Sequence, residues 1–180
     1  DELEEIKRRL KELIDRDRES VKRTEDELRE LIKRLRKSVD DSRKEAERLI
    51  RELERLVKEG VDRRDIERLI REIKKRVKEL NDENRRLAEE ILRRVEKLDK
   101  ENKETSEEIR KRVKRLVDEV RTDEIRELLE RVERALRESK ERSRKLLEDV
   151  RRAIEKVERD SEKLLKDVEE ALERVKRERD

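Results

Sequence analysis

The sequence has no cysteine, histidine, methionine, proline or aromatic residue, and it has a single glycine. Without cysteine and histidine the chain has no thiol nucleophile, no imidazole base, no disulfide and no ligand set for a soft or borderline metal. No apolar run approaches the about 18 residues of a membrane-spanning helix, and no apolar signal-peptide core follows a basic start. We therefore expect no enzyme activity, no catalytic residue, no metal and no cofactor, and the sequence assigns no cellular compartment.

Charged side chains dominate what is present. They make up 63% of the 180 residues, and 58 basic against 55 acidic residues leave a net charge of +3. Low hydrophobicity with high charge is typical of disordered chains. Here both signs are interleaved and the apolar residues are periodic, so they can gather on one helix face. Ala, Glu, Lys, Leu and Arg together make up more than half of the chain, and this composition without proline predicts long helices.

An 18-residue repeat is clearest in the last third of the chain. Residues 126–143, 144–161 and 162–179 are three copies of one pattern, and equivalent apolar spacings run through the first two thirds. Eighteen residues make five turns of a relaxed α-helix, so we expect nearly straight helices. The phase of the repeat breaks at Gly60 and again after Val120, which predicts a turn at each place. Gly60 suits the left-handed position that follows a helix. The expected helix starts are Asp62 as N-cap with Asp65 in the first turn, Thr122 as N-cap before Asp123 and Glu124, and Asp1 with Glu4 as a capping box.

The sequence therefore predicts an all-α fold in a single domain over residues 1–180. The expected architecture is an elongated, up-down-up antiparallel three-helix bundle, with helices at about 2–59, 63–120 and 123–179. Each helix of about 58 residues would be about 87 Å long. Folding the chain at its two turns pairs position i with about 121 − i, and position j with about 244 − j.

Polar residues interrupt the apolar stripes at heights that match across the three predicted helices. One layer collects Ser20, Thr24, Asn102, Thr105, Ser106, Ser139 and Ser143. The other layer collects Ser38, Ser42, Asn81, Asn84 and Ser161.

We interpret the two layers as buried hydrogen-bond networks that fix helix register. A buried polar group without a partner costs about 1–3 kcal/mol, so a helix that slides by one turn is penalised. A small-molecule or water-filled pocket is the alternative, and the lack of aromatic lining residues disfavours it. Asp17 lies beside the first layer, either as an acceptor for that network or as a boundary residue paired with an Arg.

A straight three-helix bundle with an 18-residue repeat, one loop glycine, Glu/Lys/Arg-rich surfaces and layered Ser/Thr/Asn networks resembles computationally designed helical bundles. The resemblance covers the whole chain and implies a very stable scaffold or assembly part with no native substrate. The second turn departs from that pattern because it lacks a glycine.

Two functions remain. In the first, the chain is a self-folding structural scaffold. In the second, it is an interaction module or assembly building block with an open apolar seam for self-association or a partner helix, and the candidate seam residues are Ile14, Ile32, Ile50 and Leu92. We expect a monomer, with a homo-oligomer or a designed helical partner as the alternative. Basic clusters fall at different positions along the predicted bundle and do not merge into one basic face, so we expect no nucleic-acid partner. Neither a small-molecule substrate nor a membrane partner is expected.

Overall fold

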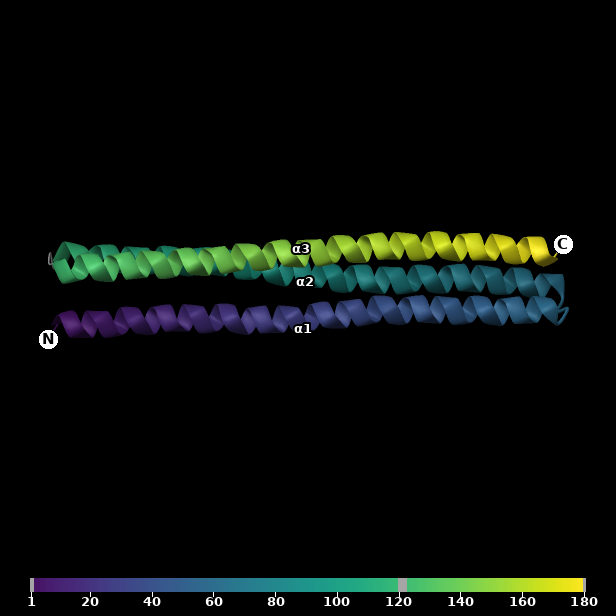
Figure 1. Cartoon of the computed structure of the whole chain (residues 1–180), viewed down its shortest axis with the longest axis horizontal. Helices are drawn as coiled ribbons and strands as arrows, with labels where there is room; N and C mark the ends of the chain where they lie inside the picture. The colour runs from purple at the N-terminus through teal and green to yellow at the C-terminus, as the bar shows by residue number, and fades with distance from the viewer. Residues whose placement is uncertain (1, 120–122, 180) are drawn as a thin grey trace. The chain divides into compact units, whose positions relative to one another are not determined.

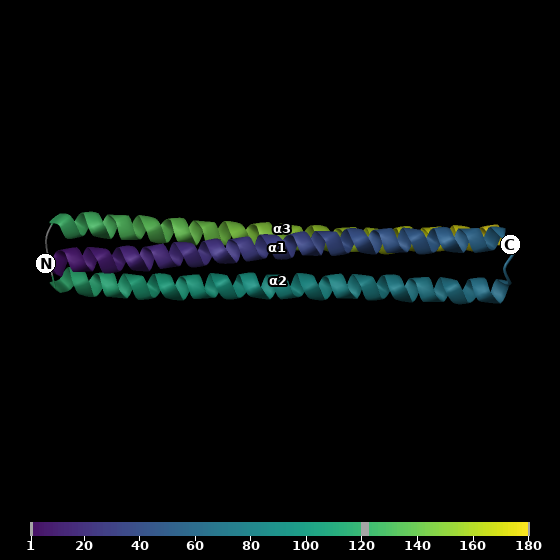
Figure 2. The same cartoon turned by 90° about the horizontal axis from the view of Figure 1, so that it is seen from below.

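The computed structural model describes residues 2–119 and 123–179, and it contains three long helices (Figures 1 and 2). They are α1 (Glu2–Lys58), α2 (Arg63–Glu119) and α3 (Asp123–Arg179), each of 57 residues. Within the described ranges there is no strand. The prediction of an all-α fold built from three long helices is therefore confirmed.

Each helix buries one stripe of apolar side chains. In α1, Leu28, Leu35 and Leu53 are at most 1% exposed, and they are separated by 7 and 18 residues. Both separations are close to whole numbers of helical turns, so these side chains lie on one face. The Lys, Arg and Glu residues between them are strong helix formers and remain in water. Burial of the stripe stabilises helices that local propensity alone would leave marginal.

The turn between α1 and α2 has the hydrogen bonds of a Schellman motif. Gly60 has φ of 77°, its N–H donates to the Val57 carbonyl (3.2 Å), and the Val61 N–H donates to the Leu56 carbonyl (3.2 Å). A left-handed residue is needed at this point, and glycine adopts that conformation without a Cβ penalty. The predicted position of Gly60 is thus confirmed.

Asp62 caps the start of α2. Its side-chain Oδ1 accepts a hydrogen bond from the Arg64 N–H (3.4 Å), and its carbonyl accepts from the Ile66 N–H (3.1 Å). Asp65 lies in the first turn of α2, and Asp123 and Glu124 lie in the first turn of α3. The expected roles of Asp1 and Thr122 fall outside the described residues.

The contacts of the chain divide it into two compact units, each containing part of every helix. Unit 1 comprises residues 1–30 and 92–151, and unit 2 comprises residues 31–91 and 152–180. The core of unit 1 includes Leu10 from α1, Ile109 from α2 and Leu136 from α3. The core of unit 2 likewise joins side chains from all three helices, among them Leu53 and Leu172.

Contacts between helices in unit 1 establish the direction of each helix. Three ion pairs join α1 to α3, and the residue numbers rise together along both helices: Lys7–Glu124 (3.7 Å), Arg18–Glu138 (3.6 Å) and Glu25–Arg142 (2.9 Å). Between α2 and α3 the numbers run in opposite senses: Asp99–Ser143 (3.2 Å), Asn102–Ser139 (3.0 Å) and Arg110–Glu133 (3.7 Å). Helix α2 is therefore antiparallel to α3, while α1 and α3 are parallel.

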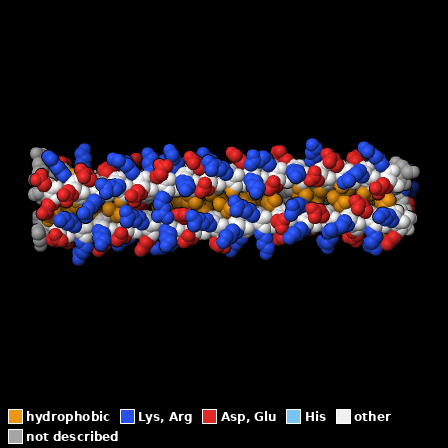
Figure 3. Space-filling view, viewed as in Figure 1, with side chains coloured by type: hydrophobic (Ala, Val, Ile, Leu, Met, Phe, Trp, Pro, Cys, Tyr) orange, Lys and Arg blue, Asp and Glu red, His pale blue; other side chains and the backbone are white. Residues whose placement is uncertain are grey.

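The surface is densely charged. Lys, Arg, Asp and Glu alternate over the visible face, with hydrophobic side chains showing between the helices (Figure 3). Among the described residues, Leu165 is the one large hydrophobic side chain classed as exposed, at 39%. No described helix has an apolar stretch suited to crossing a membrane.

Candidate functional site: the buried polar clusters

Three residues of unit 2 form a hydrogen-bonded group between α1 and α2. The Ser38 hydroxyl donates to Asn84 Oδ1 (2.5 Å), and Asn84 Nδ2 donates to the Ser42 Oγ (3.0 Å). The Ser42 hydroxyl in turn donates to the Ser38 carbonyl (2.8 Å). Asn84 and Ser42 are 1% and 3% exposed, so both amide atoms of a buried asparagine are paired across the interface.

A second contact in unit 2 joins α2 to α3. Asn81 Nδ2 donates to the Ser161 carbonyl (3.3 Å), and both residues are half-buried. Asn81 Oδ1 is buried and has no hydrogen-bond partner among the described residues. We call Ser38, Ser42, Asn81, Asn84 and Ser161 the unit 2 polar cluster.

In unit 1 a reciprocal hydrogen-bonded pair joins α2 to α3. The Ser139 hydroxyl donates to Asn102 Oδ1 (3.0 Å), and Asn102 Nδ2 donates to the Ser139 carbonyl (3.4 Å). Next to it, the Ser143 hydroxyl donates to Asp99 Oδ1 (3.2 Å), and Lys103 Nζ lies 3.3 Å from Asp99 Oδ2. Asn102, Ser139 and Ser143 are all buried. We call Asp99, Asn102, Ser139 and Ser143 the unit 1 polar cluster.

Asp99 was missed in the sequence analysis. It lies 18 residues after Asn81, just as Asn102 lies 18 residues after Asn84. The repeat therefore contained the signal, but an aspartate among so many charged residues does not stand out.

Residues of α1 take no part in the unit 1 polar cluster. The expectation that Ser20 is buried is wrong: its side chain is exposed. It precedes Val21, the buried residue, by 100° of helical rotation, and its side chain is too short to reach across the interface. The Thr24 hydroxyl donates to the Ser20 carbonyl within α1 (3.0 Å). Thr105 and Ser106 of α2 are half-buried, and neither hydroxyl forms a hydrogen bond with another described residue.

Asp17 lies on the buried stripe of α1, four residues before Val21, and is only 9% exposed. No hydrogen bond or ion pair joins its carboxylate to another residue in the part of the chain that the structure describes. Neither of the two roles considered for Asp17, network acceptor or partner of an arginine, is found.

Ion pairs of half-buried and exposed side chains lie on the surface of unit 2. Arg76 Nε and Nη2 donate to the two carboxylate oxygens of Glu45 (2.9 and 3.4 Å), and these bonds raise the pKa of Arg76. On α1, a hydrogen bond from Lys44 is the main cause of a lowered pKa for Asp40, whose carboxylate also accepts a bond from Arg43 (2.6 Å). These groups remain in contact with water, and their ion pairs stabilise the surface of the helices.

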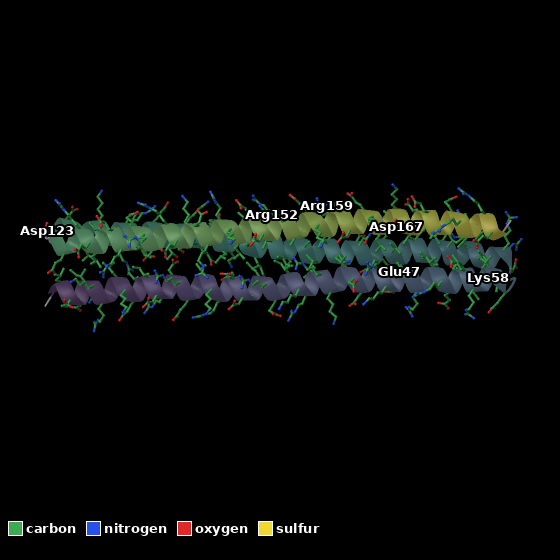
Figure 4. The ribbon with its side chains drawn as sticks, viewed as in Figure 1. Glu47, Lys58, Asp123, Arg152, Arg159 and Asp167 are labelled. Carbon is green, nitrogen blue, oxygen red and sulfur yellow. The ribbon has the colours of Figure 1, made fainter. Side chains whose placement is uncertain are left out.

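The described surface has shallow grooves between α1 and α3. In unit 2 the groove floor includes Ala46 and Ala171, which are 0% and 5% exposed, and its rims include Glu47 and Asp167 (Figure 4). Ile50, a candidate seam residue, also lines this groove, and Ile14 lines the corresponding groove in unit 1. Most of the apolar floor is thus already covered. The remaining candidate seam residues, Ile32 and Leu92, are half-buried.

No group of three or more described Asp or Glu side chains is placed to hold a metal ion. Most of the buried polar side chains of the two clusters bind one another or backbone carbonyls, whereas Asn81 Oδ1 has no partner among the described residues.

Comparison with known proteins supports the fold assignment. No protein-family model matches the chain, and no curated protein matches it. Among solved structures, the chain is similar to a "Computationally designed three helix bundle", with a TM-score of 0.59 and 18% sequence identity. The match covers 99% of this chain and 93% of that one. At this level of identity the likeness concerns the fold, and the fold of this chain is that of a three-helix bundle.

Proposed function

We propose that the chain is a designed structural scaffold without a native biochemical activity, and that its polar clusters fix the register of its helices. The observation that carries the proposal is the reciprocal Asn102–Ser139 pair, in which each residue both donates and accepts. A slip of one turn moves a helix by about 5.4 Å and would separate the pair. Each buried group left unpaired would then cost about 1–3 kcal/mol.

Three further observations support this proposal. The fold is similar to that of a designed bundle. The composition provides no Cys thiol and no His imidazole for catalysis. The same 18-residue spacing of apolar positions recurs in all three helices, and such regularity is typical of idealised backbones.

The test replaces Asn84 and Asn102 together with leucine and measures helix register directly. Because the chain has no cysteine, spin labels at Glu101→Cys and Lys140→Cys report one distance between the exposed faces of α2 and α3. We expect the double variant to melt at the same or a higher temperature, while the single distance broadens or gains a second population. Ser20→Ala is the control, because Ser20 is exposed. A double variant that keeps one narrow distance would show that the clusters do not determine register.

A second candidate function is an assembly building block with an apolar seam between α1 and α3. Half-buried Ile14 and Ile50 in the two grooves favour it. Light scattering in line with size exclusion distinguishes the two candidates: a mass near 22.3 kDa supports the scaffold, and a multiple of it supports assembly. If the chain assembles, Ile14→Glu with Ile50→Glu should return it to one chain, whereas Leu92→Glu, outside both grooves, should not.

A further inference from the structure

We infer that the groove between α1 and α3 in unit 2 is a docking site for one further helix, whose two flanks carry charges opposite to those on the rims of the groove. This goes beyond the scaffold role, which requires no partner. Charged residues follow one another along both rims in the same order of signs. The α1 rim consists of Arg36, Asp40, Arg43 and Glu47, and the α3 rim consists of Lys156, Asp160, Lys163 and Asp167.

Contacts within unit 2 show which residues of α1 and α3 lie at the same height. Ser38 of α1 bonds to Asn84 of α2, and Asn81 of α2 bonds to the Ser161 carbonyl of α3. Asn84 lies three residues after Asn81, so on the antiparallel α3 its height corresponds to position 158, three residues before Ser161. Residues at one height on α1 and α3 therefore differ in number by about 120.

Each residue of the α1 rim thus faces a residue of the same sign on the α3 rim. The four rows are basic, acidic, basic and acidic in turn, and they consist of Arg36 with Lys156, Asp40 with Asp160, Arg43 with Lys163 and Glu47 with Asp167. The last row can be followed in Figure 4, where Glu47 and Asp167 lie at the same height along the two helices. Beyond it, Arg51 and Arg174 add one more basic residue to each side of the groove.

The like charges of unit 2 do not pair across the groove. No ion pair joins α1 to α3 among the described residues of this unit. The four residues of the α3 rim, together with Arg36 and Glu47, have no side-chain partner in the part of the chain that the structure describes. Asp40 pairs along its own helix with Arg43 (2.6 Å) and Lys44 (3.1 Å). Six of the eight rim charges are therefore available to a partner.

The groove of unit 1 between the same two helices differs in this respect, because opposite charges bridge it. Lys7 Nζ lies 3.7 Å from Glu124 Oε2, and Arg18 Nη2 lies 3.6 Å from Glu138 Oε2. All four residues line that groove. Charge thus closes the groove of unit 1 and leaves the groove of unit 2 without internal pairs.

Small apolar side chains form the floor between the rims in unit 2. Ala46 of α1 and Ala153 and Ala171 of α3 are at most 8% exposed, and half-buried Ile50 lines the same groove. The distance at which two helices pack depends on the side chains at their contact, so alanine lets a neighbouring helix approach closely. The apolar stripe of a docked helix would cover this floor, and its flanks would lie over the rims.

The occupant that fits is a helix with an apolar stripe flanked on both sides by acidic, basic, acidic and basic residues, in the order of the rows. Such a helix places an opposite charge beside every rim residue. Sliding it by one row, about 5 Å, opposes like charges along both rims. Charge complementarity of this kind selects the partner and also fixes its register.

Two synthetic helices of identical composition test the docking. The matched peptide carries Glu, Lys, Glu and Lys on both flanks of a leucine and alanine stripe. It also carries one tryptophan, whose fluorescence has no background because the chain contains no aromatic residue. The mismatched peptide has the opposite order on one flank, so every row contains one attractive and one repulsive contact in any register. At concentrations where each peptide is monomeric, we expect one matched peptide to bind saturably, at least about tenfold more tightly than the mismatched one and less tightly at high salt.

Reversal of the α3 rim provides the matched variant of the chain, with Lys156→Glu, Asp160→Lys, Lys163→Glu and Asp167→Lys. This variant keeps the net charge and gains opposite charges across the groove. It should melt at the same or a higher temperature and lose its preference for the matched peptide. The control reverses four exposed residues of α3 that do not line the groove, Glu155→Lys, Arg159→Glu, Glu162→Lys and Lys166→Glu, and it should bind like the original chain.

Three outcomes would overturn the inference. The first is no saturable binding or equal affinity for the two peptides, and the second is a preference that survives reversal of the α3 rim. The third is a chain whose mass by light scattering is a multiple of 22.3 kDa and returns to one chain when the α3 rim is reversed, because a second copy would then occupy the groove. The spin-label test of helix register between α2 and α3 does not depend on these outcomes, so failure of docking and failure of the scaffold proposal are distinguished.

Discussion

Truncation of Asn84 to alanine is the most direct test of how the unit 2 polar cluster contributes to stability. Asn84 is 1% exposed, accepts a bond from Ser38 and donates one to Ser42. Asn84→Ala removes both bonds and leaves the half-buried Ser38 hydroxyl without its acceptor. Ser42 keeps its bond to the Ser38 carbonyl.

The expected loss follows from these contacts. Two buried hydrogen bonds are worth about 1 kcal/mol each, and the small cavity left by the amide adds about 1 kcal/mol. We therefore expect Asn84→Ala to lower the free energy of unfolding by about 2–4 kcal/mol. Asn84→Leu loses the same bonds, but burial of its apolar side chain returns about 1.5–3 kcal/mol, so its stability should be close to that of the original chain.

Guanidinium titration followed by far-ultraviolet circular dichroism measures both variants, because the chain has no aromatic fluorescence. Ser20→Ala, in α1, is the control for an exposed polar side chain, and it should change the free energy of unfolding by less than about 0.5 kcal/mol. If Asn84→Ala and Asn84→Leu destabilise the chain equally, the energetic account of the cluster is refuted.

Three further predictions concern the turn and the surface of unit 2. Gly60→Ala should lower stability by about 1–2 kcal/mol in thermal melts, because φ is 77° and no atom lies within 4 Å of the added Cβ, so backbone strain is the entire cost. Asp62→Ala should cost about 0.5–2 kcal/mol in the same assay, since the N-cap acceptor of α2 is lost. Titration of Asp40 by NMR should give a pKa below 3.8, and Lys44→Ala should move it back toward that value. Because the folded-state pKa of Asp40 is lowered, its interaction with Lys44 stabilises the chain above the unfolded-state pKa and is lost as the pH falls through the folded-state pKa. An unchanged pKa of Asp40 in Lys44→Ala would contradict the assigned cause.

The features that could be predicted from the sequence depend on the conformation of single residues and on contacts between residues close together in the chain. A break in the apolar period beside a lone glycine gives the place of the first turn, because no other residue adopts its left-handed conformation at so little cost. The role of Asp62 as N-cap was also predictable, because its capping hydrogen bond joins residues only two positions apart in the sequence.

The pairing of polar residues was only partly predictable. The 18-residue spacing shows which residues share a helix face, but it does not show which of them meets a polar partner on the facing helix. Ser20 and Ser38 are equivalent by this spacing, and yet Ser20 is exposed while Ser38 bonds to Asn84. The difference depends on which side chain of the facing helix lies opposite, and a periodicity does not contain that information.

The Schellman turn at Gly60 also has a consequence for the order of folding. Contacts between α1 and α2 extend outward from it with growing separation along the chain: 31 residues for Glu45–Arg76, 46 for Ser38–Asn84 and 67 for Glu27–Arg94. The entropy cost of closing a loop increases with its length, so the hairpin should zip from the turn outward. The ion pairs between α1 and α3, such as Glu25–Arg142 at 117 residues apart, should form later. The end of α1 that lies farthest from the turn is thus the last to gain its tertiary contacts and the first to lose them.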